Sequence, residues 1–131
     1  MEQIKILLVE ESNIAATAIS TMLKEKGCQV DIVDNGITAL KKYKTESYNL
    51  ILINTCLGKG KSIEITRQIR EHEIVLPCRK IIPIIGIFSD PWSGEDETPP
   101  YQKYLLAGMT DVFFQPLTML LINEILKKYM Y

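Results

Sequence analysis

Residues 49–54 read Asn-Leu-Ile-Leu-Ile-Asn, a run of branched apolar side chains that ends on an amide. A run that is almost continuously apolar is typical of a strand buried on both faces of a parallel sheet. Four other short apolar runs recur along the chain, over residues 4–9, 29–33, 82–88 and 111–114. Together the five runs predict a five-stranded parallel sheet.

Segments with helical periodicity separate these runs. The first lies at about 12–26, where Ser12 is a suitable helix cap and Gly27 stands at the usual stop position. One apolar stripe is predicted on this helix, made of Ile14, Ala18, Ile19, Met22 and Leu23. The other helices are predicted at residues 37–46, 62–73, 100–107 and 117–129. Strands that alternate with helices indicate a doubly wound α/β domain with helices on both faces of the sheet.

The bulk composition indicates a single globular domain over residues 1–131. Hydrophobic residues make up 47% and charged residues 24%, and the net charge of −1 provides no basic surface for nucleic acid. No apolar run approaches the length of a membrane span and no leader precedes Ile4, so we expect no membrane insertion. Three widely separated cysteines without metal-binding spacing favour a reducing, cytoplasmic location.

The residues that follow the predicted strands are the candidate site, because ligands of doubly wound sheets bind beyond the carboxyl ends of the strands. Glu10 and Glu11 follow the first run, and Asn54 ends the third. Phe88 ends the fourth run, and Gln115 follows the fifth. No glycine-rich dinucleotide motif follows the first run.

Several segments, in their order and spacing, resemble the receiver domains of two-component response regulators over nearly the whole chain. ILLVEES (6–12) and NGITAL (35–40) resemble the opening of that family, and YNLILINTCL (48–57) resembles the segment around its phospho-acceptor. AGMTDVFFQPL (107–117) resembles the family's ending, and EITRQIR (64–70) resembles the third helix of receivers attached to hybrid histidine kinases. The resemblance implies a flavodoxin-like fold with strand order 2-1-3-4-5.

The family's chemistry corresponds to six positions of this chain, and most of them have changed. Glu10 and Glu11 stand where the family has the two acids that hold magnesium, and Asn54 stands at the phosphorylated aspartate. Phe88 stands at the hydroxyl residue that contacts the phosphoryl group, and Val112 at the switch aromatic. Gln115 stands at the lysine that pairs with the phosphoryl group.

Three of these changes remove groups that the phosphorylation reaction needs. The amide of Asn54 is a poor nucleophile, Gln115 supplies no positive charge, and Phe88 has no hydroxyl. Magnesium favours carboxylate oxygens, so we expect no cofactor beyond a weakly bound Mg²⁺. We also expect a direct hydrogen bond between the Asn54 and Gln115 amides.

The resemblance and these changes together predict a non-phosphorylatable receiver-like domain that is not an enzyme. Its expected partner is a protein, either a histidine kinase or another phosphorelay protein. Two alternatives stay open, namely an active receiver phosphorylated at an atypical site and a small P-loop-like nucleotide-binding domain. The second rests on GKGKS (58–62), where Lys59, Lys61 and Ser62 are a candidate anion site at a helix start.

A partner surface is predicted near the end of the chain. Trp92 lies in the polar segment 89–100, which is longer than receivers usually carry and whose two final prolines should shorten the next helix to one or two turns. The last helix has more apolar residues than one buried stripe needs, which leaves Met119 and Leu120 available to a partner.

Overall fold

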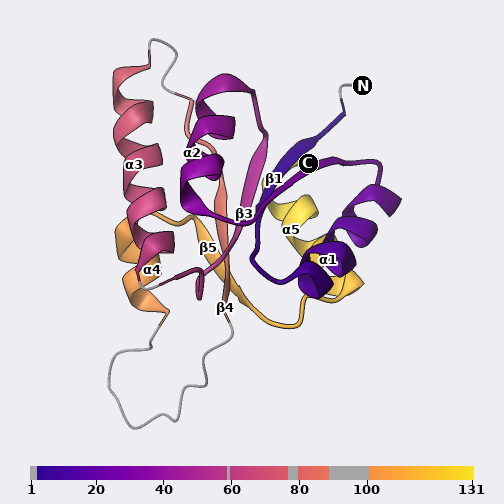
Figure 1. The fold of residues 1–131 in the computed structure, drawn as a ribbon. Helices are drawn as coiled ribbons and strands as arrows, with labels where there is room; N and C mark the ends of the chain where they lie inside the picture. The colour runs from indigo at the N-terminus through magenta and orange to yellow at the C-terminus, as the bar shows by residue number, and fades with distance from the viewer. Residues whose placement is uncertain (1–2, 59, 77–79, 89–100) are drawn as a thin grey trace, which may run out of the picture.

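A five-stranded parallel sheet with helices on both faces forms the domain (Figure 1), in a computed structural model that describes residues 3–58, 60–76, 80–88 and 101–131. The strand order is β2-β1-β3-β4-β5, as the resemblance implied. The strands are β1 (Lys5–Val9), β2 (Gln29–Val33), β3 (Leu50–Asn54), β4 (Ile84–Phe88) and β5 (Asp111–Phe114).

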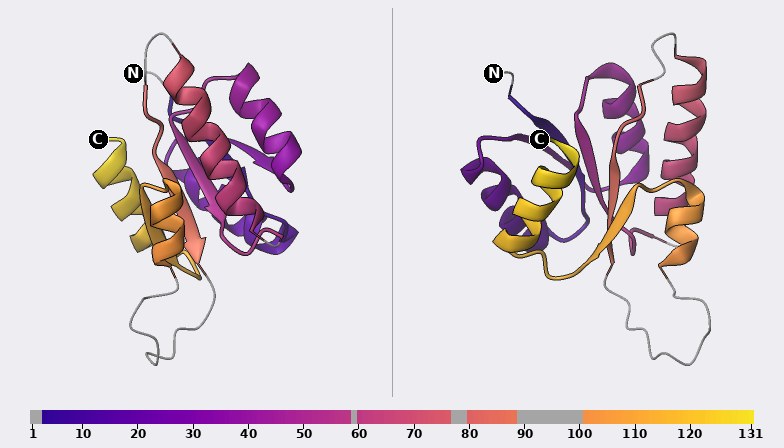
Figure 2. Two further views of the ribbon diagram at one scale, coloured as in Figure 1. Left: turned by 90° about the vertical axis from the view of Figure 1, so that its left-hand side faces the viewer. Right: turned by 180° about the vertical axis from the view of Figure 1, so that it is seen from behind.

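Two helices cover one face of the sheet and three cover the other (Figure 2). The first pair is α1 (Asn13–Glu25) and α5 (Met119–Tyr129), and the second group is α2 (Gly36–Thr45), α3 (Lys61–Val75) and α4 (Gln102–Ala107). Among the described residues, none of these helices has the length and apolar character needed to cross a membrane.

Alternation along the central strands explains why their sequences are continuously apolar. In β3, Leu50 and Leu52 pack towards α1 and α5, whereas Ile51 and Ile53 pack towards the other three helices. All four side chains are fully buried. Because successive side chains of a strand point to opposite faces, a strand covered on both faces needs apolar residues at every position.

Most helix ends follow the signals in the sequence. The Ser12 hydroxyl accepts a hydrogen bond from the Ala15 N–H and starts α1, and Gly27 adopts a left-handed φ of 85° just after that helix. The helix α4 has only six residues, within the predicted one or two turns.

The predicted apolar stripe of α1 is wrong in part. Its buried face consists of Ala16, Ile19, Ser20 and Leu23, whereas Ile14 is 85% exposed. At 100° per residue, Ile14 lies about 140° around the helix from Ile19, so both cannot face the sheet.

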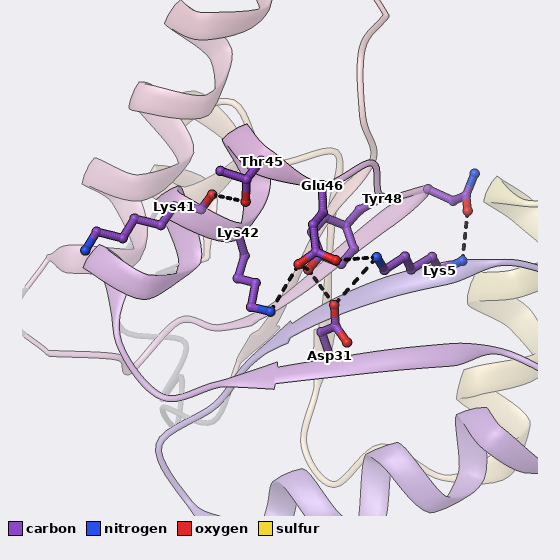
Figure 3. Close-up of polar contacts among 8 residues, drawn as sticks. Lys5, Asp31, Lys41, Lys42, Thr45, Glu46 and Tyr48 are labelled. Atoms are coloured by element: carbon purple, nitrogen blue, oxygen red, sulfur yellow. Dashed lines mark hydrogen bonds and ion pairs between the residues drawn. The ribbon is translucent and has the colours of Figure 1, made fainter.

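A polar network joins the amino end of β1, the middle of β2 and the end of α2 (Figure 3). The Lys5 ammonium lies 2.7 Å from one oxygen of Glu46, and Lys42 lies 3.1 Å from the other. The buried Tyr48 hydroxyl donates to Asp31 at 2.6 Å. Burial and the Asp31 carboxylate raise the pKa of Tyr48, so this hydroxyl remains a donor.

The network predicts a specific loss of stability in acid. Hydrogen bonds from Lys5 and Lys42 lower the pKa of Glu46 from 4.5 to about 2. A carboxyl whose pKa is depressed on folding stabilises the protein above its unfolded pKa and loses this contribution as the pH falls through the folded one. We therefore expect the parent to be more stable than Glu46→Gln at neutral pH, and this difference to shrink between about pH 4.5 and pH 2.

Urea unfolding of both proteins at several pH values measures this difference. Glu46→Gln is the matched control, because it leaves every other titrating group in place. A difference in stability that stays constant down to pH 2 would show that Glu46 is not held by the two lysines.

Candidate functional site

The carboxyl ends of the strands bring the predicted site residues to one edge of the sheet. Strands β1 and β3 are parallel neighbours, with Val9 opposite Ile53. Glu10 and Asn54 are the next residues on these strands, so the register places them side by side.

An amide–carboxylate pair forms where a receiver of ordinary sequence would carry two acids. The Asn54 Nδ2 donates to both oxygens of Glu10, at 3.0 Å to Oε1 and 2.8 Å to Oε2. The Ser12 N–H donates to the same Oε1 at 3.0 Å, and Asn54 Oδ1 accepts from the Cys56 N–H at 2.8 Å. Glu10 is only 2% exposed, so hydrogen bonds and not water satisfy its carboxylate.

This arrangement does not fit a divalent cation. The Asn54 group that faces Glu10 is the NH₂ donor, which cannot ligate a cation, and the Asn54 oxygen is turned towards the Cys56 N–H instead. Glu11 is exposed. Among the described residues, no cluster of three His, Cys, Asp or Glu side chains is arranged to hold a metal ion.

Phe88 belongs to the core. Its ring is fully buried and makes edge-on contacts with Tyr104 and Phe114, with ring centroids 5.9 and 5.5 Å apart. A third edge-on contact joins it to Tyr101 at 6.4 Å. Phe88 therefore ties the end of β4 to α4 and β5 through aromatic packing.

The expected Asn54–Gln115 hydrogen bond is wrong. Both polar atoms of the Asn54 side chain are bonded to Glu10 and Cys56, and the structure gives the Gln115 side chain no hydrogen bond to Asn54. The Gln115 backbone N–H donates to Phe88 O at 2.9 Å and extends the pairing of β4 with β5. Val112 is partly buried and packs on the core under α2, α3 and α4.

The candidate anion site does not come together. Ser62 is fully buried, and its hydroxyl donates to Thr55 O at 3.0 Å, so it is not available to an anion. Lys61 is exposed at the first position of α3, and Lys59 lies outside the described residues. The Ser62 hydroxyl instead links the start of α3 to the residue that follows β3.

The residues of the predicted partner surface differ in exposure. Leu120 is 80% exposed on α5, whereas Met119 is partly buried against the core beneath α1 and α5, so Met119 is not a free contact residue. Trp92 lies outside the described residues. Other large apolar residues are exposed as well, among them Ile14 at 85% and Phe114 at 51%. The exposure of Ile14 could have been predicted from the sequence, because its angle around the helix from Ile19 places it away from the buried face.

Comparisons with known proteins agree with this fold. The family model described as "Response regulator receiver domain" matches residues 6–127. Hybrid signal transduction histidine kinase G of Dictyostelium discoideum is 29% identical over 130 residues, which are 98% of this chain and 4% of that protein. Aerobic respiration control sensor protein ArcB of Escherichia coli K12 is 25% identical over 126 residues, 96% of this chain and 15% of that protein.

A solved structure gives the same result. The receiver domain of sensor histidine kinase PA1611 from Pseudomonas aeruginosa PAO1 superposes with a TM-score of 0.80 and 27% identity, over 98% of each chain. That relative holds a magnesium ion in its active-site cleft. This chain spans only a small part of each of the two kinases above. Since the family model covers nearly all of it, the chain belongs to the response regulator receiver domain family.

Proposed function

We propose that this receiver domain is not phosphorylated and has no enzymatic activity of its own. The observation that carries the proposal is the state of Asn54, the residue at the phospho-acceptor position. Its side chain is a neutral amide, and both of its polar atoms are engaged, with Glu10 and with the Cys56 N–H. An amide held in this way offers no nucleophilic oxygen to a phosphoryl donor.

The neighbouring residues support the same conclusion. Gln115 supplies no positive charge to a transferring phosphoryl group, and Phe88 supplies no hydroxyl. We expect Mg²⁺ to bind with a dissociation constant in the millimolar range or weaker, on the order of that of low-charge sites. The reason is that Glu11 is the one exposed carboxylate of the acidic pair.

The domain would then act as a standing contact module in two-component or hybrid-kinase signalling. Phe88 is locked in aromatic packing and Val112 replaces the switch aromatic, which supports one fixed conformation. Its partner would be a histidine kinase or another phosphorelay protein in the cytoplasm. Leu120, exposed on α5, is the predicted contact residue that the structure leaves accessible.

Incubation with acetyl phosphate and magnesium, followed by mass spectrometry of the intact protein, tests the proposal. We expect no phosphate on the parent chain and none on Asn54→Asp, because Asn54→Asp still lacks the lysine. The matched control is Asn54→Asp/Gln115→Lys, which restores two of the family's groups and is expected to acquire a measurable phosphorylated fraction.

The opposite result is also well defined. A hydroxylamine-labile increase of one phosphate mass on the parent would contradict the proposal and favour an active receiver with an atypical acceptor.

A further inference from the structure

A buried charge near Asn54 needs an explanation that goes beyond the missing phosphorylation. Glu10 is 2% exposed, and no lysine, arginine or histidine among the described residues forms an ion pair with it. A buried carboxylate is stable only if it is paired or fully hydrogen-bonded. Here the bonds come from two sources, the Asn54 amide and the Ser12 N–H.

We propose that the Asn54 amide replaces a metal ion in this receiver. Its NH₂ group contacts both Glu10 oxygens and thereby joins the ends of β1 and β3 without a cation. The Glu10–Asn54 clamp, as we name this pair, would make the stability of the domain independent of Mg²⁺. This inference does not depend on the proposed function, because it concerns what compensates Glu10 and not whether Asn54 reacts.

The orientation of the amide is determined from both sides. Turning the Asn54 side chain over would place its oxygen against the Glu10 carboxylate and its NH₂ group against the Cys56 N–H. Both new contacts would be repulsive, since two acceptors or two donors would face each other. A cation that bridges Glu10 and Asn54 would have to displace the Asn54 NH₂ group from the Glu10 carboxylate, so the clamp and a metal ion bound between these two residues exclude one another.

The environment also indicates what a carboxylate at position 54 would do. Asn54→Asp would place a second carboxylate at the position from which the Asn54 amide now contacts both oxygens of buried Glu10, and like charges this close repel each other unless a cation lies between them. The clamp therefore predicts that this single substitution turns a magnesium-independent fold into a magnesium-dependent one.

An exchange of the two roles provides the matched control. In Asn54→Asp/Glu10→Gln, the amide lies on β1 and the carboxylate on β3, so one amide–carboxylate pair is kept. The Ser12 N–H can still donate to the new amide oxygen, and the Cys56 N–H can donate to the new carboxylate. If the amide–carboxylate pair is what stabilises the domain, the stability of the exchanged protein should not depend on magnesium.

Thermal unfolding of the three proteins, in EDTA and in millimolar MgCl₂, tests the proposal. The parent is expected to have the same Tm in both buffers. Asn54→Asp should melt lower than the parent in EDTA by about 5 °C or more, and should regain much of this loss in MgCl₂. The exchanged protein should recover most of the loss in EDTA and gain little from MgCl₂.

Three results would overturn the proposal. The first is a parent Tm that rises in MgCl₂ as much as the Tm of Asn54→Asp does. The second is an Asn54→Asp protein that is as stable as the parent in EDTA. The third is an exchanged protein that is no more stable in EDTA than Asn54→Asp. If Asn54→Asp folds only with magnesium, that is the predicted dependence in its strongest form. Phosphorylation of the parent by acetyl phosphate would contradict the proposed function and leave these melting results unaffected.

Discussion

Replacing Arg70 by Ala is expected to lower the free energy of unfolding by about 3–5 kcal/mol, because it leaves a buried carboxylate without its cation. That carboxylate belongs to Glu73, which is 5% exposed and lies 2.8 Å from Arg70 Nη1. The same guanidinium donates to Gly108 O and to Ile82 O, both at 2.8 Å. Arg70 therefore connects α3 to the end of α4 and to the segment before β4. Its loss should weaken the packing of these three segments against one another.

Urea unfolding with a double-mutant cycle measures this effect. The matched control is Arg70→Met/Glu73→Gln, which removes both charges and keeps similar volumes, so it should be clearly more stable than Arg70→Ala. Glu73→Gln alone should also be costly, since Glu73 Oε2 accepts from the Ile82 N–H at 2.6 Å while its other oxygen pairs with Arg70. Additive single effects, with no coupling between the two residues, would contradict the interpretation.

The Phe88→Ala variant is expected to lose about 3–5 kcal/mol, the usual cost of truncating a fully buried phenylalanine. The ring fills the space between β4, β5 and α4, where it meets Tyr101, Tyr104 and Phe114. Because α4 has only six residues, these aromatic contacts are a large part of what holds it. Amide hydrogen exchange should therefore show α4 losing protection beyond the global loss.

Two controls separate packing from chemistry at this position. Phe88→Leu keeps much of the apolar volume and should cost clearly less than Phe88→Ala. Phe88→Thr restores the hydroxyl type of the family but removes most of the ring's contacts, so it should be nearly as unstable as Phe88→Ala. Equal stability of parent and Phe88→Thr would show that the ring is not needed for packing.

Much of the fold was readable from the sequence because it depends on local pattern. The continuously apolar run of residues 50–53 required a strand covered on both faces, and the structure buries it completely. Capping by Ser12 and the left-handed Gly27 bounded the first helix as expected, since both signals act within a few residues along the chain. The strand order came from resemblance, because periodicity alone does not determine which strands are neighbours.

The identity of the site residues was also contained in the sequence, but their bonding partners were not. Asn54 pairs with Glu10 and not with Gln115, because the parallel register of β1 and β3 places Val9 opposite Ile53 and brings the next residues together. The buried Ser62 hydroxyl donates to Thr55 O for a similar reason. The packing of α3 on β3 decides which side chains of α3 are buried. The sequence by itself determined which side chains stand at the carboxyl ends of the strands. Only the tertiary structure decided which of them meet, because a hydrogen bond between residues 44 positions apart depends on strand register and not on local pattern.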